Sequence, residues 1–360
     1  MPEVLIESFS RFQLEDGTTL NDVNVAYRTW GKLNASKDNA VVVCHSLSGD
    51  SNVDAWWTPL IGPGRALCTD QYFVVCANLL GSCYGTTGPT SINSETGQPY
   101  ASSFPVPTIR DNVRLQQRLL DRLGVRQLEM VIGGSIGGMI AIEFALMEPT
   151  LKRLVAVATS GRHSAWCIGW TEAQRQAIYA DPDWKGGNYS PDRPPIAGLA
   201  SARMMAMLSY RTPASFSERF GREVMTSAGE PFLVESYLRY QGDKLVHRFD
   251  ANSYVRLTQT SNSHDVARNR GKYEDILGSV RQQTLIVGVD TDILFPLNEQ
   301  QELARCIPDA ELAVLRSPHG HDAFLLEGAK LNSVVQSWMG RSHSVPKPPQ
   351  KEEHAHQTEQ

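Results

Sequence analysis

Residues 131–140 read VIGGSIGGMI, and this stretch decides the fold. A single serine, Ser135, lies between two pairs of glycines, directly after one apolar run and directly before another. Three local structures could explain the pattern: a loop that cradles phosphate, a glycine turn without chemical function, or a sharp strand-to-helix bend that presents a nucleophilic serine. The rest of the chain distinguishes between them.

The phosphate-binding loop fits poorly. It requires a lysine followed by serine or threonine after the glycines, where this chain has Met139 and Ile140. A dinucleotide-binding G-x-G-x-x-G pattern also fails, because Ser135 stands where the middle glycine would be. The pattern G-x-S-x-G does fit residues 133–137, between the strand-like LEMVI and the helix-like GGMIAIEFALM. We therefore interpret Ser135 as a candidate nucleophile at a strand-to-helix bend.

Six short apolar runs predict a parallel sheet. They are rich in Val, Ile and Leu, and each ends in small or polar residues, as is typical of strands buried on both faces. The runs are NAVVVCHSL, YFVVCANLL, LEMVIGGS, LKRLVAVATS, QTLIVGVD and AELAVLRSP. Helix-like stretches such as TIRDNVRLQQRLLDRLGV separate several of them. This alternation predicts an α/β fold with its ligand site at the carboxyl ends of the strands.

The alternation stops in the middle of the chain. Residues 161–271 contain several helix-like stretches and no convincing buried strand, so we expect a helical lid inserted into the sheet domain. The α/β core would then comprise residues 1–160 and 272–341. The remaining residues, 342–360, are polar and contain almost no aliphatic side chains, and we expect them to be disordered.

Composition limits the classes of partner. The chain has 360 residues, 41% hydrophobic and 20% charged, with a formal net charge of -5, which gives no electrostatic reason to expect nucleic acid or an anionic membrane. No run approaches the roughly 20 apolar residues that span a bilayer, and we expect a cytoplasmic protein that binds small molecules or copies of itself. Its six cysteines form no C-x-x-C pair, so we expect structural thiols.

A serine nucleophile needs a base and an orienting carboxylate later in the chain. In a G-x-S-x-G fold the chain order is Ser, then Asp or Glu, then His. Asp290 and Asp292 follow the strand-like QTLIV, whereas His319 and His321 follow the strand-like AELAVL. Order and placement agree with a triad, but spacing alone does not choose between the members of each pair.

The remaining parts of the site follow from the same logic. Backbone N–H groups of Leu47, in the loop CHSLSGDS, and of Ile136, at the start of the helix, are the expected oxyanion hole. His45 in that loop is either structural or functional. A metal site beginning at His319, His321 and Asp322 would need further ligands from scattered histidines, so we expect no metal.

With these residues assembled, the chain resembles the homoserine O-acetyltransferase family of α/β-hydrolase-fold acyltransferases over roughly residues 5 to 340. The stretch RHSAWCIGWTEAQRQAIY resembles especially the fungal branch, which also contains deacetylcephalosporin C acetyltransferase. The other stretches that carry the resemblance include CHSLSGDSNVDAWWTPLIGPGRALCTDQYFVVCANLLGSCYGTTGPTS, GQPYASSFPVPTIRDNVRLQQRLLDRLGV, GGSIGGMIAIEFA, GLASARMMAMLSYRT and GHDAFLLE.

The resemblance implies a triad. The family nucleophile falls on Ser135, its acid on Asp292, which precedes Leu-Phe-Pro, and its base on His321 of GHDAFL. The implied fold is an α/β-hydrolase fold with an inserted helical lid domain.

The resemblance also implies substrate-binding residues. Arg203 would pair with the carboxylate of an amino-acid acceptor, Tyr210 would reach into the active site, and Asp322 would hold the acceptor's ammonium group. Seven residues, the spacing of Arg203 and Tyr210, is about two helical turns, so both side chains can share one face.

The implied activity is a double displacement. Acetyl-CoA serves as co-substrate, no cofactor is permanently bound, and an acetyl group passes through Ser135 to L-homoserine in methionine synthesis. Family members are commonly homodimers that pair through the lid helices. The same scaffold supports L-serine as acceptor and succinyl-CoA as donor, and an esterase would share triad and fold. A noncatalytic protein would need a defective triad, whereas all three members are present here.

Overall fold

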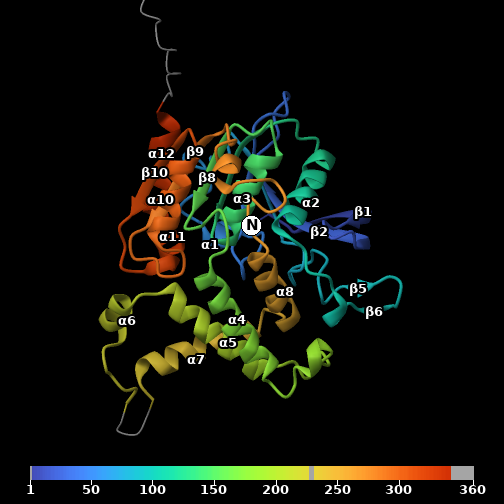
Figure 1. The fold of residues 1–360 in the computed structure, drawn as a ribbon, viewed down its shortest axis with the longest axis vertical. Helices are drawn as coiled ribbons and strands as arrows, with labels where there is room; N and C mark the ends of the chain where they lie inside the picture. The colour runs from blue at the N-terminus through green and yellow to red at the C-terminus, as the bar shows by residue number, and fades with distance from the viewer. Residues whose placement is uncertain (1, 227–230, 342–360) are drawn as a thin grey trace, which may run out of the picture.

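The computed structural model describes residues 2–226 and 231–341, so the predicted disordered tail, 342–360, lies outside the described residues. Its eight-stranded central sheet (Figure 1) contains β1 (Leu5–Gln13), β2 (Thr19–Trp30), β3 (Ala40–Cys44), β4 (Phe73–Ala77), β7 (Leu128–Gly134), β8 (Arg153–Val157), β9 (Gln283–Val289) and β10 (Ala310–Leu315). A separate two-stranded pair is formed by β5 (Ile92–Asn93) and β6 (Gln98–Pro99).

The helices fall into two groups. Those of the sheet domain are α1 (Val53–Trp56), α2 (Ile109–Arg122), α3 (Ile136–Met147), α9 (Tyr273–Leu277), α10 (Leu297–Cys306), α11 (Ala323–Leu326) and α12 (Gly328–Gly340). Those that follow β8 and precede α9 are α4 (Ala165–Tyr179), α5 (Ile196–Tyr210), α6 (Pro213–Phe220), α7 (Leu233–Val246) and α8 (Ala251–Asn262). Short 3-10 turns lie at η1 (Ala101–Ser103), η2 (Lys185–Gly187) and η3 (Gly320–Asp322).

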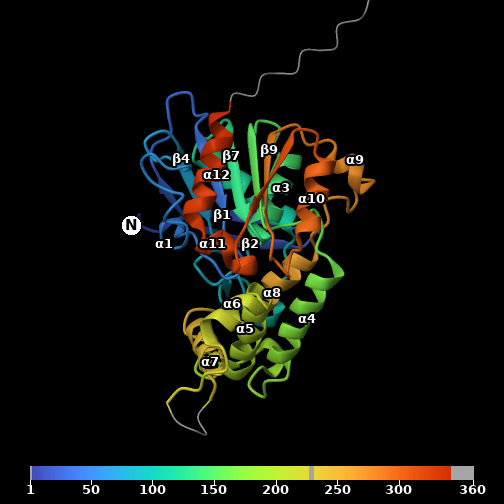
Figure 2. The ribbon, with the colours of Figure 1, turned by 90° about the vertical axis from the view of Figure 1, so that its left-hand side faces the viewer.

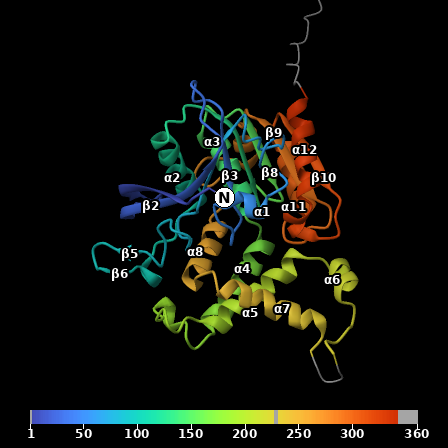
Figure 3. The same ribbon diagram turned by 180° about the vertical axis from the view of Figure 1, so that it is seen from behind.

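The sheet has the order β1-β2-β4-β3-β7-β8-β9-β10. From β4 to β10 its neighbours pair in parallel, whereas β2 pairs antiparallel with both β1 and β4. Figure 3 shows β2 toward one side of the molecule and β10 toward the other. Each of the six apolar runs predicted as strands forms a parallel strand, and the α/β prediction is confirmed.

Helices cover both faces of the parallel strands. Successive residues of β3 point to opposite faces: Val41 and Val43 belong to the same buried cluster as Trp338 of α12, whereas Val42 belongs with Ile140 of α3. In Figure 2, α12 lies on one side of the sheet and α3 and α10 lie on the other. Because β3, β4, β7, β8 and β9 are buried on both faces, they need apolar residues at nearly consecutive positions, which explains their apolar runs. Strand β10, at the edge of the sheet, is only partly buried.

The predicted lid region is helical, as Figures 1 and 2 show, with α4 to α7 gathered at one end of the sheet. Helix α5 packs between α4 and α7, and α8 runs from this group back toward the sheet. The sequence analysis did not anticipate α6, which is only eight residues long. Its start is nevertheless encoded locally, because the Thr212 hydroxyl accepts a hydrogen bond from the N–H of Ser215 and Pro213 occupies the first helical position.

Two glycines allow β3, β7 and α3 to approach closely. A Cβ atom at Gly137, in the first turn of α3, would overlap the carbonyl oxygen of Cys44 at the end of β3. A Cβ atom at Gly133, in β7, would overlap the carbonyl of Gly137 itself. The glycines flanking Ser135 are therefore required by packing, which excludes the unstructured glycine turn.

The substitution Gly137→Ala should destabilise the fold, because the added methyl meets rigid backbone rather than a side chain that could move. Overpacking of this kind costs about 1–3 kcal/mol, and we expect the upper end of that range. The matched control is Gly169→Ala in α4, where an added Cβ meets nothing within 4 Å. Alanine is more stable than glycine in a helix, so this variant should not lose stability. Thermal unfolding checks this: equal melting temperatures for the two variants would contradict the packing argument.

Candidate functional site

Ser135 lies at the junction of β7 and α3 in a strained backbone conformation. Its φ of 60° and ψ of -125° place a non-glycine residue in a region that L-residues rarely adopt. Several hydrogen bonds hold it there: its N–H donates to the carbonyl of Val157 at 2.9 Å, and its carbonyl accepts from the Thr159 hydroxyl at 2.8 Å. This geometry lifts the Ser135 side chain out of the strand and above the start of α3, as a nucleophile requires.

His321 and Asp292, the predicted base and acid, contact each other. Nδ1 of His321 lies 2.7 Å from Oδ2 of Asp292, and both side chains are buried. Because a carboxylate can only accept, Nδ1 carries the proton and Nε2 is left as the base. The other carboxylate oxygen, Oδ1, accepts from the backbone N–H groups of Leu294 at 2.8 Å and Phe295 at 2.9 Å. Asp292 is thus fixed in orientation by its own loop.

Three aromatic rings surround the His321 imidazole. Phe295 stacks on it with centroids 5.3 Å apart, Phe324 meets it edge-on at 5.4 Å, and Tyr210 lies at 5.7 Å. Burial lowers the pKa of His321, but the charge and hydrogen bond of Asp292 outweigh it, and the net shift is upward. The imidazole is therefore a stronger base than a free histidine.

The structure separates the two candidates in each pair that spacing left open. Asp290 is exposed, and its Oδ1 accepts from the backbone N–H of Ser317 rather than from a histidine. His319 lies in a different cavity from Ser135. Within the described residues no hydrogen bond joins the Ser135 hydroxyl to His321, and such contacts commonly tighten only in the Michaelis complex.

The two residues predicted for the oxyanion hole flank Ser135. Leu47 follows β3 and Ile136 is the first residue of α3, and both line a cavity together with Ser135. The first N–H groups of a helix have no partner within the helix, and they lie at the positive end of its dipole. The backbone of Ile136 can therefore stabilise a negative oxygen that develops beside Ser135.

His45 is structural. Its Nδ1 lies 2.8 Å from the Ser46 carbonyl, and its Nε2 accepts from the Leu79 N–H at 3.2 Å. Both ring nitrogens are thereby satisfied, and burial lowers the pKa of the imidazole, so it stays neutral. The ring holds the loop that carries Leu47 in place.

The reaction cavity brings together most of the predicted residues. Arg203 and Tyr210, both on α5, line it with Ser135, His321 and Asp322. The Arg203 guanidinium lies over the Tyr210 ring, 5.6 Å from its centroid. A positive and a negative side chain thus lie beside the nucleophile, which is the charge pattern that an amino-acid zwitterion requires.

Arg211 is a residue that sequence reasoning missed. Its Nε lies 3.0 Å from Oδ2 of Asp322, and both side chains are mostly buried. Burial raises the pKa of Asp322, although the charges of Arg211 and Arg203 oppose that shift. Its partner Asp322 lies far away in the sequence, so no spacing indicated this pair. Asp322 is therefore already paired on one oxygen before any ligand binds.

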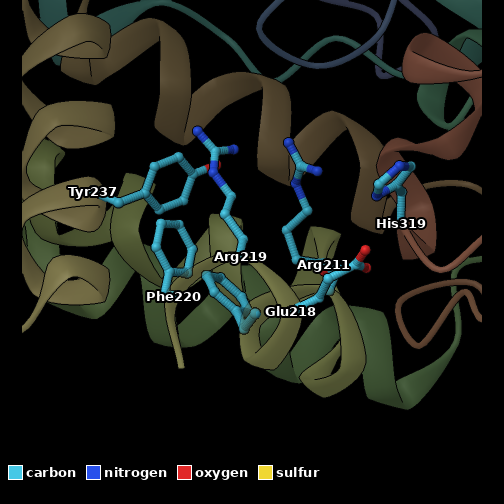
Figure 4. A pocket seen from close by; sticks show the side chains of 8 residues that line it. Arg211, Glu218, Arg219, Phe220, Tyr237 and His319 are labelled. Carbon is cyan, nitrogen blue, oxygen red and sulfur yellow. The ribbon is translucent and has the colours of Figure 1, made fainter. Parts of the chain in front are cut away.

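Arg211 also lines a larger cavity of about 340 Å³, between α6, α7 and the loop that contains His319. Figure 4 shows the guanidinium groups of Arg211 and Arg219 directed to the same side of it, with Phe220 and Tyr237 beside Arg219. No member of the triad is among its lining residues. Size therefore does not identify the reaction cavity, whereas the position of Ser135 does.

Three further findings concern the part of the chain at 2–226 and 231–341. No group of three or more His, Cys, Asp or Glu side chains in it could hold a metal ion. No helix within these ranges combines the length and the apolar character needed to cross a bilayer. All six cysteines are free thiols, and four of them are buried.

Comparisons with known proteins agree with this geometry. The model of the alpha/beta hydrolase fold matches residues 39–328. A homoserine O-acetyltransferase of Nostoc punctiforme is 57% identical over 331 residues, covering 90% of this chain and 92% of that protein. Among solved structures, homoserine O-acetyltransferase from Bacillus anthracis superposes with a TM-score of 0.87 at 28% identity, covering 96% of this chain and 100% of that one. Esterase E22 gives the same TM-score at 28% identity, covering 94% and 100%.

The substitution Asp292→Asn should slow acylation of Ser135 by about 10³ to 10⁴-fold, because the amide cannot hold the productive tautomer of His321. The remaining activity should persist to lower pH. The reason is that the base acts only when neutral and that the charge of Asp292 raises the pKa of His321 in the native enzyme.

The rate of the acetyl burst with p-nitrophenyl acetate, measured against pH, checks both effects. The matched control is Asp290→Asn, which keeps the oxygen that accepts from Ser317. A larger loss in the Asp290 variant would contradict the assignment of the acid.

Proposed function

Because this chain belongs to the homoserine O-acetyltransferase family of α/β-hydrolase-fold enzymes, we propose that it transfers an acetyl group from acetyl-CoA to the hydroxyl of L-homoserine. Several relatives of that name, between 45% and 57% identical, span most of the chain. Acetyl-CoA is in this proposal a co-substrate rather than a resident cofactor.

One observation carries the proposal: Arg203 and Asp322 lie in the same cavity as Ser135. A simple ester offers nothing to such a pair, whereas the α-carboxylate of an amino acid can pair with Arg203 and its α-ammonium with Asp322. Asp322 has its Oδ1 oxygen left for this, since Arg211 contacts Oδ2. The acceptor's hydroxyl would then lie toward Ser135.

Acylation would proceed as in other serine acyltransfer enzymes. His321 Nε2 takes the proton of the Ser135 hydroxyl, whose oxygen attacks the thioester carbonyl of acetyl-CoA. The N–H groups of Leu47 and Ile136 would stabilise the tetrahedral oxyanion. His321 then gives its proton to the departing CoA thiolate, and Ser135 is left as an acetyl ester.

Deacylation would use the same groups in reverse. His321 removes the proton of the homoserine hydroxyl, the alkoxide oxygen attacks the acetyl ester, and Ser135 recovers its proton as O-acetylhomoserine leaves. Water is the competing nucleophile. The lid helix α5 supplies Arg203 and Tyr210 to the cavity, so the elements that bind the acceptor also limit access of solvent.

The proposal extends to the setting of the reaction. The activity would serve methionine biosynthesis in the cytoplasm, as the family resemblance implies. We further propose a homodimer that pairs through the lid helices. Exposed apolar side chains on those helices support this: Ile196 and Leu208 of α5 and Tyr240 of α7 would be covered by such pairing.

An esterase is the second candidate, and the fold similarity to esterase E22 favours it. It would share every triad contact described above, so the triad cannot distinguish the two functions. Whether the reaction requires an amino-acid acceptor does distinguish the two functions. L-Serine is the alternative acceptor, because it is one methylene shorter than homoserine and one methylene in a pocket changes discrimination by only about 1 to 3 kcal/mol. Succinyl-CoA is the alternative donor that the family scaffold supports.

The first experiment offers acetyl-CoA or succinyl-CoA with homoserine, serine or no acceptor, and follows CoA release and product mass. We expect release that needs both acetyl-CoA and homoserine, and its loss in Ser135→Ala. Equal CoA release without an acceptor would identify a hydrolase. No release with any pair would contradict the proposed function.

Arg203→Gln should raise the KM for homoserine by about 10- to 100-fold, because a hydrogen bond between charged groups contributes about 1.5–3 kcal/mol. The acetylation burst with acetyl-CoA in the absence of acceptor should stay within about twofold of the native rate, since Arg203 pairs with the acceptor and not with the thioester. Arg239→Gln, an exposed arginine of α7, is the control. Equal losses in both half-reactions would contradict an acceptor-binding role.

A further inference from the structure

Ser135 lines a second cavity, to which Arg203 does not contribute. This acyl-side cavity has a volume of about 40 Å³ and contains both residues of the predicted oxyanion hole. Its walls come from α3, from α4 and from the loop after β9 that carries Asp292. The lining residues are Leu47, Ser135, Ile136, Met139, His163, Cys167, Trp170, Thr171, Gln174, Tyr210, Ser261, Leu294 and Phe295.

The two cavities beside Ser135 differ in charge. The reaction cavity holds Arg203 and Asp322, whereas no Asp, Glu, Lys or Arg is among the lining residues of the acyl-side cavity. Its one titratable imidazole, His163, is neutral, because burial and the neighbouring His264 and Arg175 lower its pKa to about 3. A charged group that entered this cavity would therefore find no counter-charge.

We propose that the acyl-side cavity is the acyl pocket of the enzyme and that it selects a two-carbon, uncharged acyl group. The inference rests on the proposed function and assigns the two cavities to the two substrates. The acceptor occupies the charged cavity, and the acetyl methyl group of the donor and of the acyl-enzyme occupies the uncharged one.

Size supports this assignment. A cavity needs roughly 10–15 Å³ to hold one water-sized group. The acyl-side cavity, at about 40 Å³, therefore accommodates about three such groups. An acetyl group, with a carbonyl and one methyl, has that size. A succinyl group extends it by a methylene and a carboxylate, for which the cavity has neither the volume nor a cation.

The far wall opposes longer alkyl chains as well. The indole nitrogen of Trp170 and both ring nitrogens of His163 are buried without a hydrogen-bond partner among the residues that the structure describes. The rings of Trp170 and His163 line this cavity of about 40 Å³, so a chain longer than acetyl would exceed its volume and would have to displace them. Phe295 lies between His163, at 5.8 Å, and His321, at 5.3 Å, so this wall is continuous with the catalytic base.

Removal of Trp170 tests the inference. The native enzyme should use acetyl-CoA at least about tenfold better than propionyl-CoA, as one methylene in a closed pocket allows. Trp170→Ala should bring the ratio of the two kcat/KM values to within about threefold of one and should admit butyryl-CoA. Succinyl-CoA should remain a poor donor, since the widened cavity still lacks a cation. Trp170→Leu, a smaller change, provides a second variant that keeps an apolar wall.

The matched control is Trp166→Ala. Trp166 lies one turn earlier in α4, is exposed, and packs against Trp170, but it does not line the cavity. Its variant should keep the native donor ratio, and because the readout is a ratio, a general loss of activity does not affect it. An unchanged ratio in both Trp170 variants, with native acetyl transfer intact, would overturn the acyl-pocket assignment. Absence of transfer from any donor by the native chain would instead overturn the proposed function.

Discussion

The site depends on the close approach of β3, β7 and α3, which only glycine at positions 133 and 137 permits. This approach forces the chain through a tight bend, and Ser135 takes the strained conformation at its apex. Such strain costs about 1–3 kcal/mol and persists only where the surroundings over-determine it. Here the buried sheet and helix supply that constraint, so the stability of the core is what presents the nucleophile.

The other two predicted members of the triad follow the ends of neighbouring strands. Asp292 follows β9 and His321 follows β10, and the parallel pairing of β7, β8, β9 and β10 brings both loops to the edge where Ser135 lies. Two backbone N–H groups and the His321 ring use three of the lone-pair positions of Asp292. The Asp292 carboxylate is thus fixed mainly by its own loop, and one hydrogen bond joins it to His321.

The sequence was most informative where both faces of an element are buried. The six parallel strands could be predicted because their runs are rich in Val, Ile and Leu and contain few polar residues, whereas β1 was missed because its LIESFSRFQ is largely exposed and mixes polar with apolar residues. The triad order was predictable from strand ends, but Asp290 and Asp292 could be separated only by resemblance, since both follow the same strand. Arg211 and Phe295 were missed because their roles depend on side-chain contacts between distant elements, which no spacing encodes.

The two cavities beside Ser135 explain how one nucleophile can serve two chemically different partners. In the proposed assignment, the carboxylate and the ammonium group of the acceptor interact favourably with the charges of Arg203 and Asp322. A methyl group makes no such interaction and needs no counter-charge in the uncharged cavity. Each substrate therefore has its most favourable place on a different side of the same ester bond. The acetyl group can stay in the acyl-side cavity during both half-reactions. The acceptor can therefore bind to the acyl-enzyme without displacing the acetyl group. In the proposed assignment, the difference in charge between the two cavities favours transfer to an amino acid over hydrolysis, even though the triad itself treats both nucleophiles alike.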